Sequence, residues 1–173
     1  MQLRADIQLR SMIKSLRDTV LPAVDPGNKP AIEQAQLVLA MLQLLESRLP
    51  LQYRFDCNEL ERQLRFATRL LEIVGNDTGA GLEPAIEAAS AALAHARRVD
   101  PARLTALIRQ LRAVGGNVLQ SAFADGTPGV RAELRDWALA LSGEQLLLDR
   151  AWLVDQGWDS DPRMLPPIDS LLR

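Results

Sequence analysis

The 173-residue sequence contains one histidine and one cysteine, so few side chains are available for metal binding or nucleophilic catalysis. His95 alone cannot form the paired Glu-x-x-His motifs of a di-iron bundle, a three-histidine metal site or an HExxH zinc site. A catalytic pair of Cys57 and His95 stays open, because such partners meet in space rather than in sequence. We favour a structural role for Cys57, since it begins an apolar helical stripe and free cysteine usually packs as a small hydrophobe.

Motifs for phosphate binding and for serine hydrolysis do not occur in the sequence. The glycine-rich stretch Gly75–Gly81, GNDTGAG, has neither the lysine of a P-loop nor a preceding strand, and no G-x-S-x-G is found. We therefore predict no catalytic residue, no metal and no cofactor. The sequence leaves enzymatic activity undecided and favours a protein without it.

Three arginines follow one another at helical spacing. Arg62, Arg65 and Arg69 occupy positions i, i+3 and i+7, which places them on one face of a helix. Guanidinium groups bind carboxylates and phosphates, so this row could contact an anionic ligand or an acidic protein partner. The interpretation we prefer is a solvated face on which neighbouring glutamates form local ion pairs.

Four apolar residues fall outside the apolar stripes of their segments. Leu3 and Ile7 lie away from the stripe of the first segment, and Phe66 and Ile73 flank the arginine row. Exposed apolar side chains that share a face often mark a contact with another chain. We predict Leu3, Ile7, Phe66 and Ile73 as interface residues.

Helices must position all of these side chains. Leucine and alanine dominate the apolar residues, aromatic residues make up 4%, and no stretch shows sustained alternation of apolar and polar residues. Helical periodicity recurs between short connections, which makes successive helices antiparallel neighbours. We predict an all-α protein, an up-and-down helical bundle of about five to six helical segments.

The segment Ala31–Leu49 is the most apolar part of the chain, and we expect it to form the central helix. Pro30 and Pro50 bracket it, and its apolar residues cover an arc too wide for a single neighbour. We therefore expect two or three helices around it. Asp25 or Asn28 is a candidate N-cap of this helix.

Further helix boundaries follow from cap residues and glycines. The stretch Asp56–Glu59 has the spacing of a capping box, so we expect the third helix to begin there and to end near Val74. Gly75–Gly81 should be a flexible loop. Asp100 should cap a helix whose first residue is Pro101.

Small residues inside two later segments need an explanation. Gly115 and Gly116 interrupt the clearest periodic segment, and a close helix crossing would explain them. At Ser142–Gln145 we favour a continuing helix over a new helix start.

The C-terminal residues differ in composition from the rest of the chain. From Gln156 onward prolines and aspartates accumulate, which predicts irregular structure. We predict a single helical-bundle domain over residues 1–155. Residues 156–173 should form an irregular tail that packs on the bundle or is partly disordered.

The charge balance and the N-terminal residues bear on partners and location. The formal net charge of −2 gives no basic footprint for nucleic acid. The first ten residues lack the apolar core of a signal peptide, and the longest wholly apolar run, Leu37–Leu42, is far too short to span a membrane. We predict a cytoplasmic protein with no membrane span and no nucleic-acid partner.

The segment RSMIKSLRDTVLPAVDPGNKPAIEQAQ, Arg10–Gln36, resembles the start of small helical proteins of unknown function in bacterial genomes. The resemblance implies a bacterial, all-helical protein and carries no catalytic motif. The leading hypothesis is a non-catalytic helical module that acts through self-association, as a homo-oligomer, or through binding to a protein partner. The alternative hypothesis is a binder of a small apolar or acyl-type ligand in the bundle interior.

Overall fold

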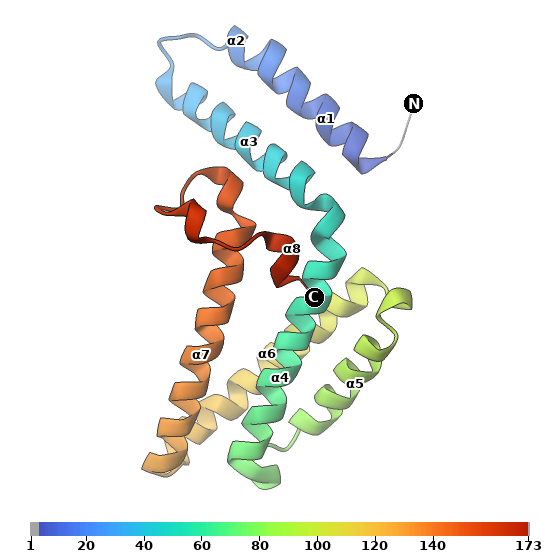
Figure 1. The fold of residues 1–173 in the computed structure, drawn as a ribbon, viewed down its shortest axis with the longest axis vertical. Coiled ribbons are helices and arrows are strands. Elements are labelled where there is room, and N and C mark those ends of the chain that lie inside the picture. The colour runs from blue at the N-terminus through green and yellow to red at the C-terminus, as the bar shows by residue number, and fades with distance from the viewer. Residues whose placement is uncertain (1–3, 173) are drawn as a thin grey trace. The chain divides into compact units, whose positions relative to one another are not determined.

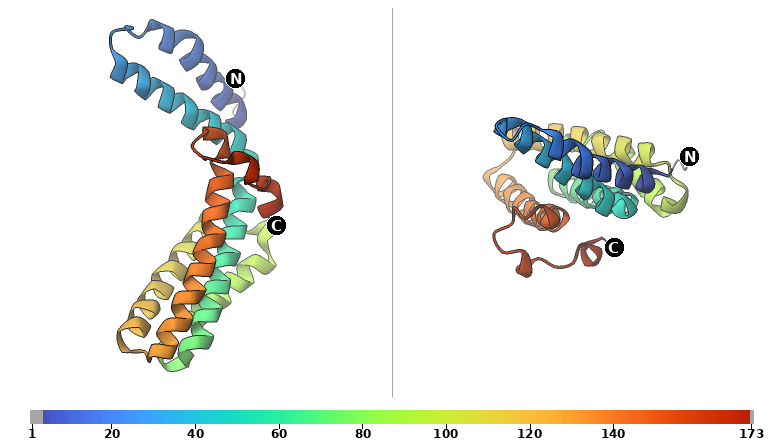
Figure 2. Two further views of the ribbon diagram at one scale, coloured as in Figure 1. Left: turned by 60° about the vertical axis from the view of Figure 1, so that its left-hand side comes forward. Right: turned by 90° about the horizontal axis from the view of Figure 1, so that it is seen from above.

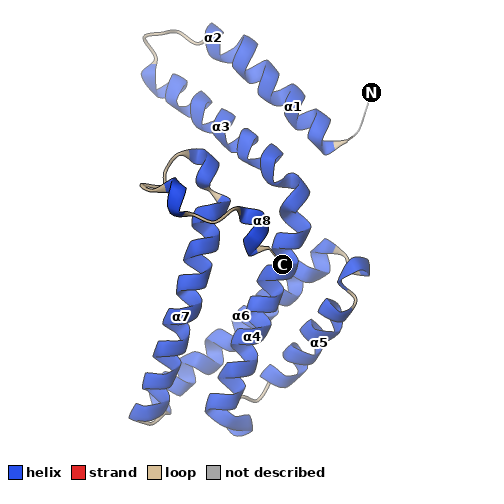
Figure 3. Cartoon of the chain, viewed as in Figure 1, coloured by secondary structure: helices blue, strands red, loops and turns tan. Residues whose placement is uncertain are grey.

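A computed structural model describes residues 4–172, with the exception of the Arg97 side chain. Within this range all regular structure is helical and the helices pack against one another, which confirms the predicted all-α bundle (Figure 3). The elements in chain order are α1 (Ala5–Ser15), η1 (Leu16–Val20), α2 (Leu21–Ala23), α3 (Lys29–Arg48), η2 (Leu49–Leu51), α4 (Gln52–Thr78), α5 (Leu82–Ala94), η3 (Ala96–Arg98), α6 (Pro101–Asp125), α7 (Pro128–Trp152), η4 (Val154–Gln156), η5 (Pro162–Met164) and α8 (Ile168–Leu171) (Figure 1).

The chain packs into two compact units, and each unit combines two stretches of sequence. Unit 1 consists of Met1–Gln52 with Asp149–Pro166, and unit 2 consists of Tyr53–Leu148 with Pro167–Arg173. The predicted domain boundary at residue 155 stays a prediction.

Unit 1 is built around the antiparallel pair of α1 and α3, which lie side by side in both views of the chain (Figures 1 and 2). The Asn28 side chain caps α3 by accepting a hydrogen bond from the backbone N–H of Ala31 at 3.3 Å, as predicted for one of the two candidate caps. Arg10 Nε donates to Glu46 Oε1 at 2.8 Å and links the two helices.

The prediction that Ala31–Leu49 forms the central helix is wrong. In α3 only Leu44 and Arg48 are buried, and one side of the helix is open to solvent. The apolar arc of this segment is wide, but a wide arc does not imply several neighbouring helices. The arc shows which residues are apolar, whereas the number of helices that cover them depends on the path of the rest of the chain.

Buried Arg48 holds the segment after α7 against α3 within unit 1. Its Nε donates to the Trp152 carbonyl oxygen at 2.8 Å, and its Nη2 lies 2.7 Å from Asp155 Oδ2. The guanidinium carbon also lies 5.7 Å from the centroid of the Trp152 ring. Gln156 Nε2 adds a hydrogen bond to the Ala40 carbonyl oxygen at 3.3 Å.

Unit 2 contains the larger apolar core, to which α4, α5, α6 and α7 all contribute. The apolar residues at helical spacing in α4 and α6 lie in this core or pack against it. The buried members are leucine, isoleucine, valine and alanine: Leu60, Ala67, Leu70, Leu82, Ala85, Ala89, Leu104, Leu107, Ile108, Leu111, Val118, Ala122 and Leu134.

Two predicted helix boundaries in unit 2 have different outcomes. The Asp100 side chain accepts a hydrogen bond from Ala102 N at 2.7 Å and caps α6, as predicted. The capping box at Asp56–Glu59 is wrong as a helix start, because α4 already begins at Gln52. Proline is tolerated in a first helical turn, so the chain re-enters helix directly after Pro50 and needs no cap at Asp56.

Glycines lie at the end of α4 and at a close contact between α6 and α4. Gly75 has a φ of 74°, so the regular helix stops there as predicted, although the turn that follows is counted with α4. Gly115 in α6 is buried, and a Cβ atom placed on it would lie 3.3 Å from Phe66 Cε1. Gly116 faces open space. Gly115 therefore leaves space for the Phe66 side chain, whereas nothing in the structure explains Gly116. The predicted close helix crossing stays a prediction.

The helix α7 continues through Ser142–Gln145 without a break, as favoured from the sequence. The Ser142 hydroxyl donates to the Ala138 carbonyl oxygen at 2.7 Å, one turn back, so it is satisfied inside the helix.

The C-terminal residues hold short helical turns rather than wholly irregular structure. Leu172 is buried in unit 2, where Asn58 Nδ2 donates to the Leu171 carbonyl oxygen at 3.2 Å.

Candidate functional site

The predicted arginine row lies on α4 and is directed toward α7. Arg65 Nη2 is 2.8 Å from Glu144 Oε2, and Arg69 pairs with Glu133 of α7 and with Glu72 of its own helix. The hydrogen bond that Arg69 donates to the Glu72 carboxylate is the main reason why the pKa of Arg69 lies above its ordinary value. Most of these acidic partners come from α7 and not from the neighbouring turns of α4. Contact with an external anion stays a prediction for Arg65 and Arg69.

Arg62 differs from the other two arginines because its side chain is enclosed. It is 8% exposed, and its Nη1 donates to Asn58 Oδ1 at 2.6 Å, one helical turn earlier. A guanidinium keeps its charge in such a position, because it is the most basic side chain and is not deprotonated in proteins. Unit 2 thus holds a buried positive charge on α4.

A cavity of about 300 Å³ borders this buried arginine. Three helices of unit 2 supply its walls: α4, α6 and α7. The lining residues combine two guanidinium groups, two amides and one hydroxyl with apolar side chains: Arg62, Gln63, Phe66, Arg112, Ala138, Leu141, Ser142 and Gln145.

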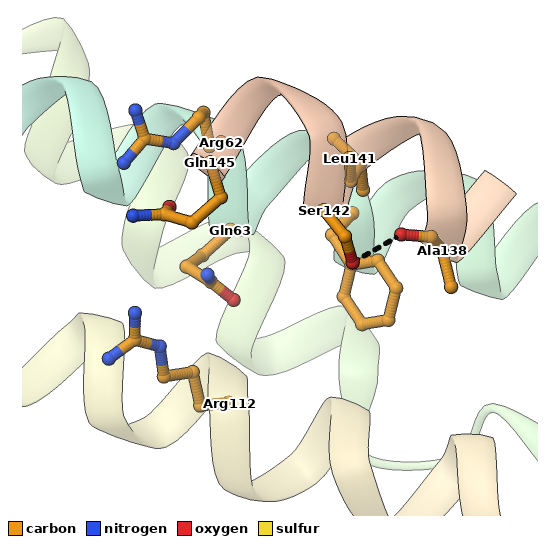
Figure 4. A pocket seen from close by; sticks show the side chains of 8 residues that line it. Arg62, Gln63, Arg112, Ala138, Leu141, Ser142 and Gln145 are labelled. Atoms are coloured by element: carbon orange, nitrogen blue, oxygen red, sulfur yellow. Dashed lines mark hydrogen bonds between the residues drawn. The ribbon is translucent and has the colours of Figure 1, made fainter. Parts of the chain in front are cut away.

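The polar and apolar parts of this cavity are separated. In the view of Figure 4 the ends of Arg62, Gln63, Arg112 and Gln145 gather on one side, and Leu141 lies on the other with Ala138 and Ser142. Small-molecule sites commonly combine apolar walls with a few convergent polar groups, and their volumes begin near 300 Å³.

Two ion pairs and one further cavity surround this site. Arg112 pairs with Glu59 of α4, whose side chain is largely enclosed. A second, more polar cavity of about 460 Å³ is walled by α4, α7 and the C-terminal residues. Its walls include the ion pair of Arg65 with Glu144, together with Ser170. Arg62 therefore lines both cavities.

The only cysteine and the only histidine do not have the properties of a nucleophile and its base. Cys57 is half-buried against the core, and burial, together with the charge of Asp56, raises the pKa of its thiol. A catalytic cysteine needs the opposite shift, because the thiolate is the reactive form. His95 is exposed at the C-terminal end of α5. These observations favour the structural role of Cys57.

Sequence reasoning missed an exposed apolar face on α3. The face is formed by leucine, valine and methionine residues that are each about half exposed: Leu37 (49%), Val38 (51%), Met41 (49%), Leu45 (54%) and Leu49 (41%), the last at the start of η2. We call these five residues the α3 face. These residues belong to the wide apolar arc of Ala31–Leu49, which predicts a buried central helix, whereas the structure leaves them half exposed.

The structure places the predicted interface residues in different environments. Ile7 is exposed on α1, at 37%. Phe66 and Ile73 are half-buried and pack against the core of unit 2. Leu3 lies outside the described residues. A role in an interface stays a prediction for these four residues.

The described part of the chain has neither a cluster of metal ligands nor a helix that could span a membrane. Among residues 4–172 no group of three or more histidine, cysteine, aspartate or glutamate side chains is arranged to hold a metal ion. None of the described helices has the length and apolar character required to cross a membrane. Comparison with models of known protein families, with curated proteins and with solved structures gives no match for this chain.

Proposed function

We propose that the chain acts without catalysis, as a helical module that associates with a second copy of itself through the α3 face. The observation that carries the proposal is the exposure of five apolar side chains on one side of α3 and at the start of η2. Contact between such a surface and water is unfavourable in free energy. Contiguous apolar patches on soluble proteins commonly mark interaction sites. Association would remove this surface from water.

The spacing of the residues suits packing against another helix. Gln34, Val38, Met41 and Leu45 follow one another at intervals of four, three and four residues. This alternation is typical of helices that cross at small angles, where side chains of one helix fill gaps between those of the other. A second α3 presents the same row, so a twofold axis would bring apolar residues against apolar residues.

The charge pattern favours a second copy as the partner. From Gln34 to Leu45 the row contains leucine, valine, methionine and glutamine, and no charged residue. Two identical surfaces repel each other when they carry like charges at their centre. This row avoids that repulsion, and the amide of Gln34 can both donate and accept hydrogen bonds with its symmetry mate.

The expected association is an equilibrium that depends on concentration. Burying the exposed half of an apolar side chain contributes about 1 kcal/mol, so five side chains from each of two copies give roughly 10 kcal/mol. The lost translational and rotational freedom costs about 4 to 15 kcal/mol. Because these terms are similar in size, both monomer and dimer should be populated as the concentration is changed.

Sedimentation velocity over a range of protein concentrations tests the proposal. We expect the wild-type protein to shift from monomer to dimer as concentration rises. The double variant Met41→Glu with Leu45→Glu should remain monomeric, because each dimer would bury four carboxylates without partners. The matched control is Gln36→Glu with Gln43→Glu, which adds the same charge to exposed positions of α3 outside the α3 face and should dimerise like the wild type.

Circular dichroism of all three proteins should give equal helix content, since every substituted residue is exposed. A wild-type protein that stays monomeric at the highest concentration would contradict self-association. Equal loss of dimer in both double variants would also contradict self-association through the α3 face. The loss would then be caused by the added net charge and not by the position of the substituted residues.

A further inference from the structure

Two side chains of α4, one helical turn apart, hold the last residues of unit 2. Arg54 Nη1 lies 2.7 Å from Asp169 Oδ1, and its Nη2 donates to the carbonyl oxygens of Asp169 and Leu172. Asn58 Nδ2 donates to the Leu171 carbonyl oxygen at 3.2 Å. The last carbonyl groups of a helix have no partner inside it, so Arg54 and Asn58 satisfy the end of α8. We call these two residues the α4 site.

A buried leucine anchors residues 167–172, which we call the C-terminal segment. Leu172 is 1% exposed, and Ile168 and Leu171 are half-buried. Leu172 is not one of the buried residues that form the core of α4, α5, α6 and α7. The C-terminal segment can therefore leave its place while that core stays closed.

The polar contacts of the C-terminal segment lie at an accessible edge. The side chains of Arg54 and Asp169 are 45% and 67% exposed. Exposed ion pairs contribute little to stability, and chain ends open more readily than core helices. The cavity of about 460 Å³ has Ser170 and Leu171 in its wall, so the segment also leaves space beside it unfilled. These features make the contact one that a competing ligand can replace.

The contacts define the chemistry of such a ligand. Hydrogen bonds to backbone carbonyl groups do not depend on the sequence of the segment. Two side chains do carry information, because the Asp169 carboxylate pairs with Arg54 and the Leu172 side chain is buried. They lie three positions apart, so a single helical turn presents both. Peptide sites commonly combine main-chain hydrogen bonds with pockets for one or two side chains.

We propose that the α4 site binds a short helical turn of another protein, in which leucine follows aspartate by three positions. The C-terminal segment occupies the site until such a partner displaces it. A partner can bind more tightly than the segment, because a larger side chain at the position of Ser170 fills the adjoining cavity. The proposal is independent of association through the α3 face, because it concerns unit 2 alone.

Fluorescence anisotropy of a labelled peptide with the sequence of residues 165–173 tests the proposal on the full chain. In the wild-type protein the tethered C-terminal segment competes at an effective concentration of about millimolar, so binding should be weak. Leu172→Glu should release the segment, because the new carboxylate would be buried without a partner. We expect this variant to bind the peptide at least about tenfold more tightly than the wild type, because the competitor is removed.

Two altered peptides test recognition by the Leu172→Glu protein. The peptide with Leu172→Glu should not bind, because it lacks the buried anchor. The peptide with Ser170→Tyr should bind more tightly than the native peptide, because its ring fills part of the cavity. Failure of the native peptide to bind, or equal binding of the native and Leu172→Glu peptides, would overturn the proposal. A Ser170→Tyr peptide without added affinity would overturn the role given to the cavity.

A second protein variant keeps the test valid if Leu172→Glu does not fold. Asp169→Lys changes an exposed side chain and places a like charge beside Arg54, so it should also release the C-terminal segment. Its helix content in circular dichroism should match that of the wild type, and it should bind the native peptide more tightly. Binding equal to that of the wild type would show that the segment does not block the site and would overturn the proposal.

A substitution in α4 locates the bound peptide. Within the Leu172→Glu protein, Arg54→Gln should weaken binding of the native peptide at least about fivefold, because charged hydrogen bonds to the peptide are lost. Arg135→Gln is the matched control in the same protein, since Arg135 is exposed on α7 and pairs locally with Asp136 at 3.1 Å. Equal binding by the two variants would place the peptide elsewhere and overturn the assignment.

A second copy of the chain carries the same segment and is the other occupant to test. Met41→Glu with Leu45→Glu removes association through the α3 face and should leave a monomer. If this variant still formed a dimer, and added Leu172→Glu abolished it, the segment would exchange between copies. The occupant would then be a second copy, which would overturn the proposed partner.

Discussion

Asp159 is held by a single guanidinium in unit 1. Its two carboxylate oxygens accept hydrogen bonds from Arg150 Nε at 2.7 Å and Nη2 at 3.0 Å, and one also accepts from the Asp161 backbone N–H at 2.9 Å. These bonds favour the charged carboxylate and lower the pKa of Asp159 from 3.8 to about 2. The side chain is only 9% exposed, so the pair is shielded from solvent. These interactions bind the segment after α7 to the C-terminal end of that helix.

Acid should weaken unit 1 through this residue. Between pH values of about 4 and about 2 the unfolded chain binds a proton at Asp159 and the folded chain does not, so folding stability falls as pH falls. Asp159→Asn removes the titration, and the wild type should be more stable than this variant above about pH 4. Thermal unfolding at several pH values should show that difference shrinking as pH approaches 2. A constant difference across this range would show that Asp159 does not titrate as described.

At the scale of single elements, α6 packs against α4 at Gly115, where the absence of a side chain leaves space for Phe66 of α4. A Cβ atom at Gly115 would come within 3.3 Å of Phe66 Cε1, closer than an ordinary contact, whereas one at Gly116 would meet no atom within 4 Å. Both glycines lie inside the helix, where alanine is favoured by about 1 kcal/mol over glycine. The two positions therefore separate helix propensity from packing.

Alanine at the two positions should have different effects on the free energy of unfolding. Gly116→Ala should stabilise the protein by up to about 1 kcal/mol, because only helix propensity changes. Gly115→Ala should be at least about 1 kcal/mol less stable than Gly116→Ala, because the added methyl group must displace Phe66. Urea unfolding followed by circular dichroism measures both. Equal stabilisation by the two substitutions would show that the Phe66 side chain moves aside without cost and that the contact does not require a glycine at position 115.

On the scale of the whole molecule, the two units differ in how much apolar surface they enclose. In the described part of unit 1 the buried apolar residues are Ile13, Leu44 and Ala151. Unit 2 encloses the core shared by α4, α5, α6 and α7. Local stability follows the number of buried apolar contacts, so the helices of unit 1 should open more readily.

Amide hydrogen exchange should reveal this difference. Amides in the middle of α6 should exchange much more slowly than those in the middle of α1 and α3, because opening α6 exposes the core of unit 2. Raising the protein concentration should slow exchange in α3 without changing α6 if a second copy covers the α3 face. Slower exchange in α3 than in α6 at low concentration would contradict the ranking of the two units.

The sequence by itself determined the helical class and the cap at Asp100, and it limited the cap of α3 to Asp25 or Asn28. These features depend on contacts within a few residues and on a repeat of 3.6 residues, both of which are visible in one segment at a time. The start of α4 was not predicted correctly even at this local level. The capping-box spacing at Asp56–Glu59 indicates a helix start, whereas α4 begins at Gln52, directly after the short turn at Pro50.

Only the tertiary structure decided which apolar residues have a partner. In α3 the residues of the apolar arc are alike in sequence, yet one part packs near α1 and the α3 face stays exposed. The cavity beside Arg62 likewise requires α6 and α7, which lie far along the chain from α4. A periodic pattern determines the direction of each side chain on its own helix. Whether that side chain is buried, forms an ion pair or lines a cavity depends on which other helix packs against it.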